Sequence, residues 1–139
     1  MRYAKTILKW LLAMFFVGAG VLHFVNEVFY LKIMPDYIPA ELHRPAVVVS
    51  GVFEVLLGAM LMVRRTTRLA AWGIIALLIA VFPANIHVYL HQELIPEAGP
   101  RAHLLRLPLQ GVLIAWAYWC TRPEKEETAL PPAPPQPAK

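Results

Sequence analysis

Four stretches of mostly apolar residues alternate with shorter polar segments along the chain. They cover roughly residues 6–26, 45–63, 69–90 and 104–121. Each approaches the roughly 20 apolar residues that a helix needs to cross about 30 Å of hydrocarbon. The pattern therefore predicts an all-α fold, an integral membrane up-down-up-down four-helix bundle.

The composition agrees with a membrane protein, because 58% of the 139 residues are apolar and only 16% are charged. We expect one transmembrane domain, residues 1–122, and the first stretch lacks the cleavage site of a secretory signal, so we expect it to be retained. Residues 123–139 are charged and then proline-rich, which predicts a disordered cytoplasmic tail.

The net charge of +4 does not predict a nucleic-acid partner, because the basic residues lie at helix ends and in loops rather than in one patch. If the N-terminus is cytoplasmic, nine basic residues lie inside and four outside, which favours both termini in the cytoplasm. The inner set is Arg2, Lys5, Lys9, Arg64, Arg65, Arg68, Arg122, Lys125 and Lys139. The outer set is Lys32, Arg44, Arg101 and Arg106.

Glu54 is the most unusual residue in this pattern, because no basic residue is closer in sequence than Arg44 or Arg64. A carboxylate in hydrocarbon must be paired, be protonated or face a water-filled cavity. Ser50 and Gly58 lie four residues before and after it, and such small residues would let another helix come close. We therefore expect Glu54 to point into the bundle.

Arg106 is the predicted counter-charge of Glu54, because a guanidinium stays charged and can fork onto a carboxylate. By helical rise, Glu54 lies near the middle of its stretch and Arg106 near the outer boundary. A contact therefore requires Arg106 to reach inward, or Gln110, Asn85 or a water molecule to bridge.

Other polar residues gather at the outer ends of the stretches. His23 and Glu27 share a helical face, and Asn26 adjoins them. His87 shares a face with His91, whereas Asn85 lies roughly opposite them unless Pro83 distorts the turn. These residues fit either helix ends that meet water or a pocket in the outer half of the bundle. They are too few on any one helix to predict a metal site.

The predicted ligand pocket or buried polar cluster comprises His23, Glu54, Asn85, Arg106 and Gln110. Its secondary candidates are Asn26, Glu27, Ser50 and His87. The segment from Tyr30 to Pro39 is apolar but contains two prolines, and we expect it to lie in the membrane interface. Cys120 is the single cysteine, so dithiol exchange within the chain is excluded.

Six short motifs occur in an order that resembles the DoxX-like family of small four-helix bacterial membrane proteins. They are GVLHF (20–24), IMPDYIP (33–39), SGVFEVLLG (50–58), TTRLAAWG (66–73), VFPANI (81–86) and RLPLQG (106–111). The resemblance covers about two thirds of the chain and implies a multi-pass protein of the bacterial cytoplasmic (inner) membrane. It also implies a redox setting, because some relatives are subunits of quinone-linked sulfur oxidation or redox-defence assemblies, although distant eukaryotic relatives are membrane-protein chaperones. The cysteine pair of disulfide-generating relatives is absent here.

Two functions from different classes remain open at this stage. In the first, the chain is an accessory or assembly subunit of a redox-associated membrane complex, and the polar cluster holds its helices in register through hydrogen bonds of about 0.6 to 2 kcal/mol each. In the alternative, it is a quinone-binding oxidoreductase subunit in which His23, Asn85, Arg106 and Gln110 donate to the quinone and Glu54 handles the proton.

The expected partners are the lipid bilayer and a membrane or redox protein, which would carry any electrons because no haem, flavin, nucleotide or iron-sulfur motif occurs in the sequence. Quinone is the one cofactor considered, and a homo-oligomer stays open. A small-molecule or ion transporter is disfavoured, because four helices leave little room for a pathway and no inverted repeat is visible.

Overall fold

The computed structural model describes residues 2–122, with Arg2 described by its backbone alone. These residues form four long helices, α1 (Arg2–Val25), α3 (Ala40–Met62), α4 (Thr67–Leu90) and α5 (Gly99–Thr121). Three short helices connect them: α2 (Glu27–Lys32), η1 (Gln92–Leu94) and η2 (Pro96–Ala98). No strand occurs within residues 2–122, so the expected all-α fold class is confirmed for them.

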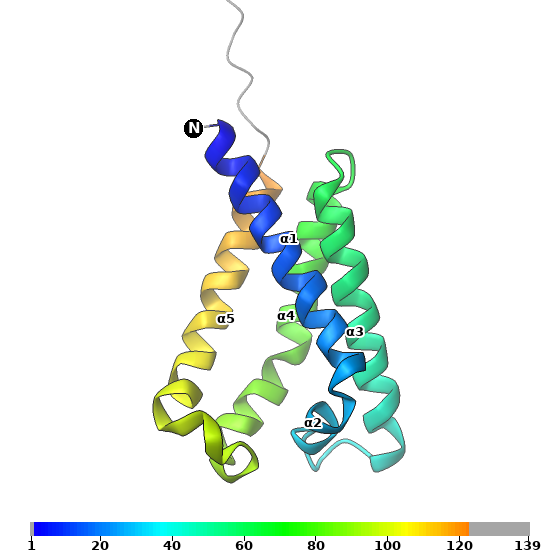
Figure 1. The fold of residues 1–139 in the computed structure, drawn as a ribbon, viewed down its shortest axis with the longest axis vertical. Coiled ribbons are helices and arrows are strands. Elements are labelled where there is room, and N and C mark those ends of the chain that lie inside the picture. The colour runs from blue at the N-terminus through cyan, green and yellow to red at the C-terminus, as the bar shows by residue number, and fades with distance from the viewer. Residues whose placement is uncertain (1, 123–139) are drawn as a thin grey trace, which may run out of the picture.

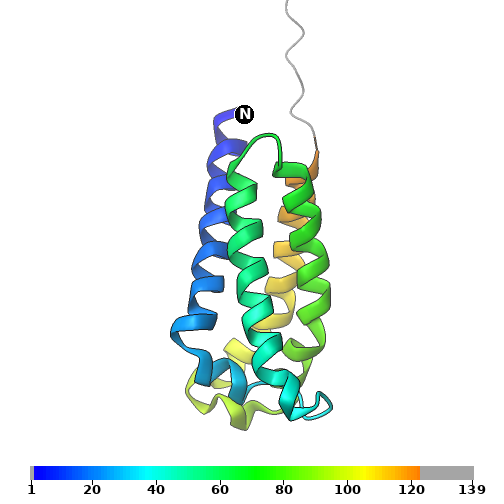
Figure 2. The same ribbon diagram turned by 90° about the vertical axis from the view of Figure 1, so that its right-hand side faces the viewer.

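Both ends of the described chain lie at one end of the molecule, together with the turn between α3 and α4 (Figures 1 and 2). The segment with α2 and the segment with η1 and η2 lie at the opposite end (Figure 1). The predicted tail, residues 123–139, lies outside the described residues.

All four long helices begin earlier than the apolar pattern predicted, and the difference is largest for α3 and α5. Helix α3 starts at Ala40 after Pro39, so Pro45 falls inside it, and α5 starts at Gly99 with Pro100 in its first turn. Proline is tolerated in a first helical turn because its missing N–H has no partner there. The apolar pattern identifies only the part of a helix that is apolar enough to lie in hydrocarbon. The first turns of these helices contain polar residues, so the pattern does not include them.

Three helices are long and apolar enough to cross a membrane, namely α1 from Tyr3 to Val25, α3 from Ala40 to Met62 and α4 from Thr67 to Leu90. Helix α5 is equally long but is not among these candidates. Its first half contains Arg106, Pro108 and Gln110, which lower its average hydropathy.

Helices α1 and α3 touch backbone to backbone along a glycine seam. A Cβ atom added at Gly20 would lie 2.7 Å from the Gly51 carbonyl oxygen, and one added at Gly51 would lie 2.7 Å from the His23 Cβ. A Cβ added at Gly58 would lie 2.9 Å from the Ala13 carbonyl oxygen. The expectation that Gly58 permits a close helix contact is therefore confirmed, and α1 is the helix that makes it.

The four long helices pack as two pairs, α1 with α3 and α4 with α5, which meet chiefly through α3 and α4. The apolar core lies toward the end that holds both chain ends. Its buried residues are Leu12, Ala13, Phe16, Leu57, Leu61, Ala70, Ala71, Ile74, Ile75, Leu78, Leu113, Ala117 and Cys120. Toward the other end, buried polar side chains such as His23 and Gln110 replace apolar ones.

The tight turn between α3 and α4 is closed by two threonine hydroxyls. Thr66 Oγ1 donates to the Met60 carbonyl at 2.6 Å, and Thr67 Oγ1 donates to the Leu61 carbonyl at 3.2 Å. Carbonyls in the last turn of a helix lack helical partners, so these bonds satisfy them. The adjoining Arg64 and Arg65 side chains are exposed.

The glycine seam predicts that Gly51→Ala destabilises the protein by about 1 to 3 kcal/mol, because the added methyl group must displace His23 or the α1 backbone. Thermal unfolding in mild detergent measures the change. Gly18→Ala is the matched control, because Gly18 lies in α1 and a Cβ added there would have no atom within 4 Å. It should be neutral or stabilising by up to about 1 kcal/mol through helix propensity. Equal unfolding temperatures for the two variants would contradict the seam.

Candidate functional site

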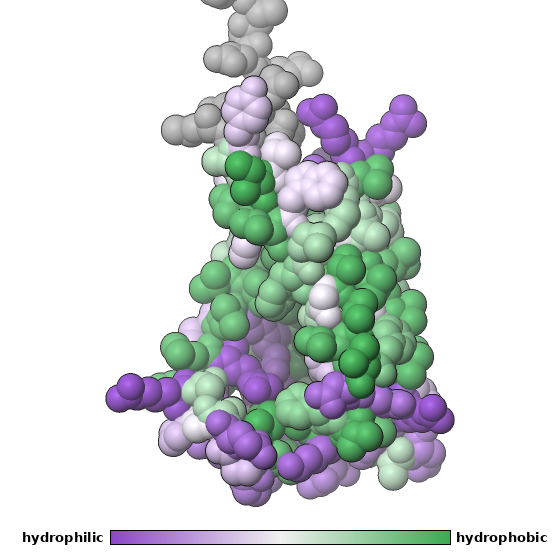
Figure 3. Space-filling model, viewed as in Figure 1, coloured by the Kyte–Doolittle hydropathy of each residue, from purple (hydrophilic) through white to green (hydrophobic). Residues whose placement is uncertain are grey.

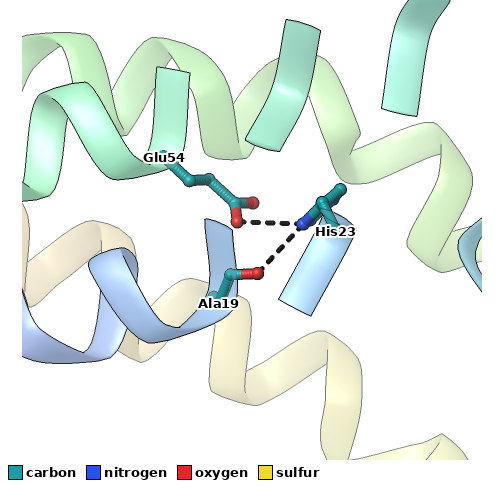
Figure 4. A network of polar contacts seen from close by, with 3 residues as sticks. All are labelled: Ala19, His23 and Glu54. Carbon is teal, nitrogen blue, oxygen red and sulfur yellow. Dashed lines mark hydrogen bonds and ion pairs between the residues drawn. The ribbon is translucent and has the colours of Figure 1, made fainter. Parts of the chain in front are cut away.

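His23 of α1 and Glu54 of α3 form a close pair across the glycine seam (Figure 4). His23 Nδ1 lies 3.0 Å from the Ala19 carbonyl oxygen and 3.3 Å from Glu54 Oε2. A carbonyl oxygen can only accept, so Nδ1 carries a proton and donates it to Ala19. The two side chains are 10% and 12% exposed. The second ring nitrogen, Nε2, is therefore the atom at which His23 changes its protonation state.

The predicted pairing of Glu54 with Arg106 is wrong, because His23 is the basic group next to this carboxylate. Within residues 2–122, no ion pair joins Glu54 to Arg106. The physical reason is which helices are neighbours. Helix α1 packs closely on α3 along the glycine seam, whereas α5 packs on α4 and barely touches α3.

Tyr30 of α2 extends this pair on its outer side. Its ring stacks on the His23 ring with centroids 3.8 Å apart and an angle of 23° between the planes. Burial raises the pKa of the Tyr30 hydroxyl, and the Glu54 carboxylate raises it further, whereas the Arg106 guanidinium lowers it. The hydroxyl therefore keeps its proton at neutral pH and lies within electrostatic reach of both charged groups. Arg106 is itself half-buried, and within residues 2–122 it forms no ion pair with Glu54.

Two buried oxygen atoms on one face of α3 have no hydrogen-bond partner in the described part of the chain. They are Ser50 Oγ and Glu54 Oε2, and they lie one helical turn apart. The Glu54 atom is within ion-pair distance of His23 but receives no hydrogen bond from it. Buried polar atoms are satisfied in the great majority of cases, so these two oxygen atoms are a place where a water molecule or a polar ligand can bind.

Asn85 and Gln110 form a second polar cluster, between α4 and α5. Asn85 Nδ2 donates to Gln110 Oε1 at 2.8 Å, and Gln110 Nε2 donates to the Leu78 carbonyl. Gln110 is buried, and both ends of its amide are bonded. Helix α4 continues through Pro83 without a break, and Asn85 faces α5 rather than the histidines that follow it.

The secondary candidates separate from one another in the structure. Ser50 belongs to the site, as described above. Glu27 forms an exposed ion pair with Arg44, with Oε1 and Nε 2.7 Å apart, and Asn26 is an exposed residue that precedes α2. The buried His87 ring lies 4.3 Å from the His91 ring at the end of α4.

Sequence reasoning missed Tyr30 and His103. Tyr30 lies seven residues after His23, a spacing that repeats a helical face, but it falls in the segment from Tyr30 to Pro39 that was expected to lie in the membrane interface. His103 is 1% exposed, and its Nε2 donates to the Ile95 carbonyl at 3.0 Å. This bond ties the first turns of α5 to the loop before it, so we assign His103 a structural role.

The half of the molecule near α2, η1 and η2 is hollowed on the face that Figure 3 shows. Hydrophilic side chains line this recess, and a hydrophobic band lies between it and the end that holds both chain ends (Figure 3). Among residues 2–122, no group of three or more His, Cys, Asp or Glu side chains is arranged to hold a metal ion.

Comparison with known proteins gave one match. The model of a family described as "Domain of unknown function (DUF8561)" matches residues 12–121. The match runs from the middle of α1 to the end of α5, and the chain belongs to this family. No curated protein and no solved structure matches the chain.

The α4–α5 cluster predicts energetic coupling between Asn85 and Gln110. Gln110→Leu should cost about 1 to 3 kcal/mol of unfolding free energy, because it leaves the half-buried Asn85 amide without its acceptor. Asn85→Leu in the same background should then cost less than it does in the wild type, with a coupling of about 0.6 to 1.7 kcal/mol. Unfolding of both single variants and the double variant measures this coupling, and strictly additive effects would refute it.

Proposed function

We propose that this member of a family of unknown function is a DoxX-like four-helix membrane protein that binds the polar head of a membrane-soluble ligand in the recess beside Glu54. In this proposal it serves as an accessory subunit of a redox-associated complex in the bacterial cytoplasmic membrane. The α4–α5 cluster holds the bundle together, and the α1–α3 cluster binds the ligand.

The observation that carries the proposal is the difference between these two clusters. Both ends of the Gln110 amide are bonded within the protein, as expected of a purely structural contact. Glu54 Oε2 and Ser50 Oγ are also buried but have no hydrogen-bond partner in the described residues. Intramembrane ionisable residues are costly, and they commonly mark ligand or proton sites.

The distribution of charge supports an orientation with both chain ends in the cytoplasm. Within residues 2–122, the end of the molecule with both chain ends carries basic residues and no acidic ones: Lys5, Lys9, Arg64, Arg65, Arg68 and Arg122. The opposite end mixes both signs, with Glu27, Asp36, Glu41, Glu93 and Glu97 among its residues. Such an excess of positive charge is typical of the cytoplasmic side.

Helix α5 is the fourth span in this proposal. Its 23 residues extend over about 35 Å, which is enough to cross the hydrocarbon region. It packs along α4 and ends beside the start of α1, where Lys5 Nζ donates to the Arg122 carbonyl. Of the polar residues in its outer half, Gln110 is buried and Arg106 is half-buried, so they do not oppose a position in lipid.

A quinone is the ligand class that the recess fits best. Its two carbonyl oxygens need hydrogen-bond donors, and the proposal assigns this role to the Tyr30 hydroxyl on α2, the Arg106 guanidinium on α5 and the Ser50 hydroxyl on α3. Glu54 and His23 Nε2 are the groups that could exchange a proton with it. The resemblance to quinone-linked DoxX-like proteins points the same way, and a partner protein would carry the electrons.

The orientation predicts which ends react with a membrane-impermeant thiol reagent. In a Cys120→Ala background, Arg65→Cys and Arg122→Cys should be labelled only when the cytoplasmic face is accessible, and Glu93→Cys should be labelled from the outside of intact spheroplasts. Arg122→Cys tests α5 by itself. If it is labelled from the outside while Arg65→Cys is not, then α5 does not cross the membrane.

The recess predicts that a quinone co-purifies with the protein from bacterial membranes in mild detergent. Glu54→Gln and Ser50→Ala should each lower the bound quinone at least tenfold, because the first replaces the carboxylate by a neutral amide that exchanges no proton and the second removes a hydroxyl donor, while the unfolding temperature stays within a few degrees of the wild type. Chromatography of the organic extract measures the bound amount per mole of protein.

Gln110→Leu is the matched control for this experiment. It should lower the unfolding temperature but leave the bound quinone per folded protein unchanged. If no quinone is found with the wild type at saturating added quinone, or if Glu54→Gln retains it fully, the proposed ligand is wrong. Loss of quinone in all three variants in proportion to their stability would instead make Glu54 a structural residue.

A further inference from the structure

An apolar groove lies between α1 and α5, away from the polar recess. Leu8 of α1 and Val112, Ala115, Trp116 and Trp119 of α5 line it, and they enclose a volume of about 380 Å³. It lies near the end of the molecule where α1 and α5 come together, and the two helices diverge from there toward the opposite end (Figure 1). All of its lining residues are apolar, and the groove is open to the surface of the molecule.

A basic side chain, Lys5, lies beside one end of this groove. Lys5 Nζ donates to the Arg122 carbonyl at 2.6 Å and lies 5.7 Å from the centre of the Trp119 ring. Lys9 follows one turn later on α1 and is half-buried. No carboxylate of the described residues lies at this end of the molecule, so none of them neutralises the charges of Lys5, Lys9 and Arg122.

The dimensions of the groove indicate what can occupy it. Val112 and Trp119 are seven residues apart, which corresponds to about 10 Å along α5. The groove is apolar along that length and open on one side, so an extended hydrocarbon chain can lie along it with its polar end beside Lys5.

We propose that this groove is a binding site for an anionic phospholipid, with one acyl chain between α1 and α5 and the phosphate beside Lys5 and Lys9. An apolar lining and basic groups that no carboxylate of residues 2–122 neutralises occur together at one place, as binding of such a lipid requires. Basic pockets between transmembrane helices on the cytoplasmic side bind anionic head groups in this way. The inference rests on the proposed membrane insertion of α1 and α5, and it is independent of the ligand in the polar recess.

The experiment uses the full chain, freed of lipid in detergent and titrated with phosphatidylglycerol or with phosphatidylcholine of identical acyl chains. Native mass spectrometry counts the bound molecules and gives their dissociation constants. Phosphatidylglycerol should fill one site at least tenfold more tightly than phosphatidylcholine. The double variant Lys5→Gln with Lys9→Gln should bind phosphatidylglycerol more weakly, with the dissociation constant raised about fivefold for each lysine removed. Ala115→Phe should abolish the site by filling the groove.

Arg65→Gln with Arg68→Gln is the matched control, because it removes the same charge at the same end of the molecule but away from the groove. It should change the dissociation constant less than twofold. A control that weakens binding as much as the lysine variant would show a diffuse charge effect and overturn the site. Equal affinity for phosphatidylcholine would overturn the role of the phosphate.

Two further outcomes concern the groove itself. If Ala115→Phe leaves phosphatidylglycerol binding unchanged, the acyl chain does not lie there and the proposal fails. If it changes the fraction of dimers in the mass spectra and not the lipid count, a second copy of the chain is the occupant and the proposal fails as well. The quinone content of the same preparations reports on the polar recess separately, so the two proposals can fail independently.

Discussion

The close contact between the backbones of α1 and α3 is the constraint on which the rest of the structure depends. Without a Cβ at Gly20, Gly51 and Gly58, the two helices approach closely enough for His23 to reach Glu54. On α2, the helix that follows α1, Tyr30 stacks on the His23 ring. A carboxylate that hydrocarbon alone would not tolerate is thus held by a neighbour on the adjacent helix.

The polar residues of the inner surface divide into two clusters with different physical characters. The cluster between α4 and α5 is neutral, and its central amide is bonded at both ends, so its role is to join two helices. The cluster between α1 and α3 contains groups that can gain or lose a proton, and it leaves two buried oxygen atoms open. A contact that only holds helices together has no need of a titratable group, which is why the second cluster carries the functional proposal.

The sequence predicted well those features that depend on neighbouring residues along the chain. Apolar length alone located all four long helices, and the spacing of Gly58 from Glu54 correctly indicated a close helix contact. The partner of Glu54 was not predictable in this way, because apolar pattern does not say which helix lies beside which. The guanidinium of Arg106 was the stronger candidate by chemistry, and the geometry of the seam favoured His23. Tyr30 was missed because it was assigned to the interfacial segment from Tyr30 to Pro39, whereas the structure places it in the short helix α2 beside His23.

The divergence of α1 and α5 affects how a molecule would arrive at the recess. The recess lies on a side face of the bundle and not at either of its ends (Figure 3). In the proposed orientation this face borders the bilayer, so an arriving molecule must first dissolve in lipid and then diffuse in two dimensions. Only molecules that partition into the membrane can therefore reach the recess. Water-soluble molecules with a similar polar group are excluded because they do not enter the bilayer, and not because the side chains of the recess reject them.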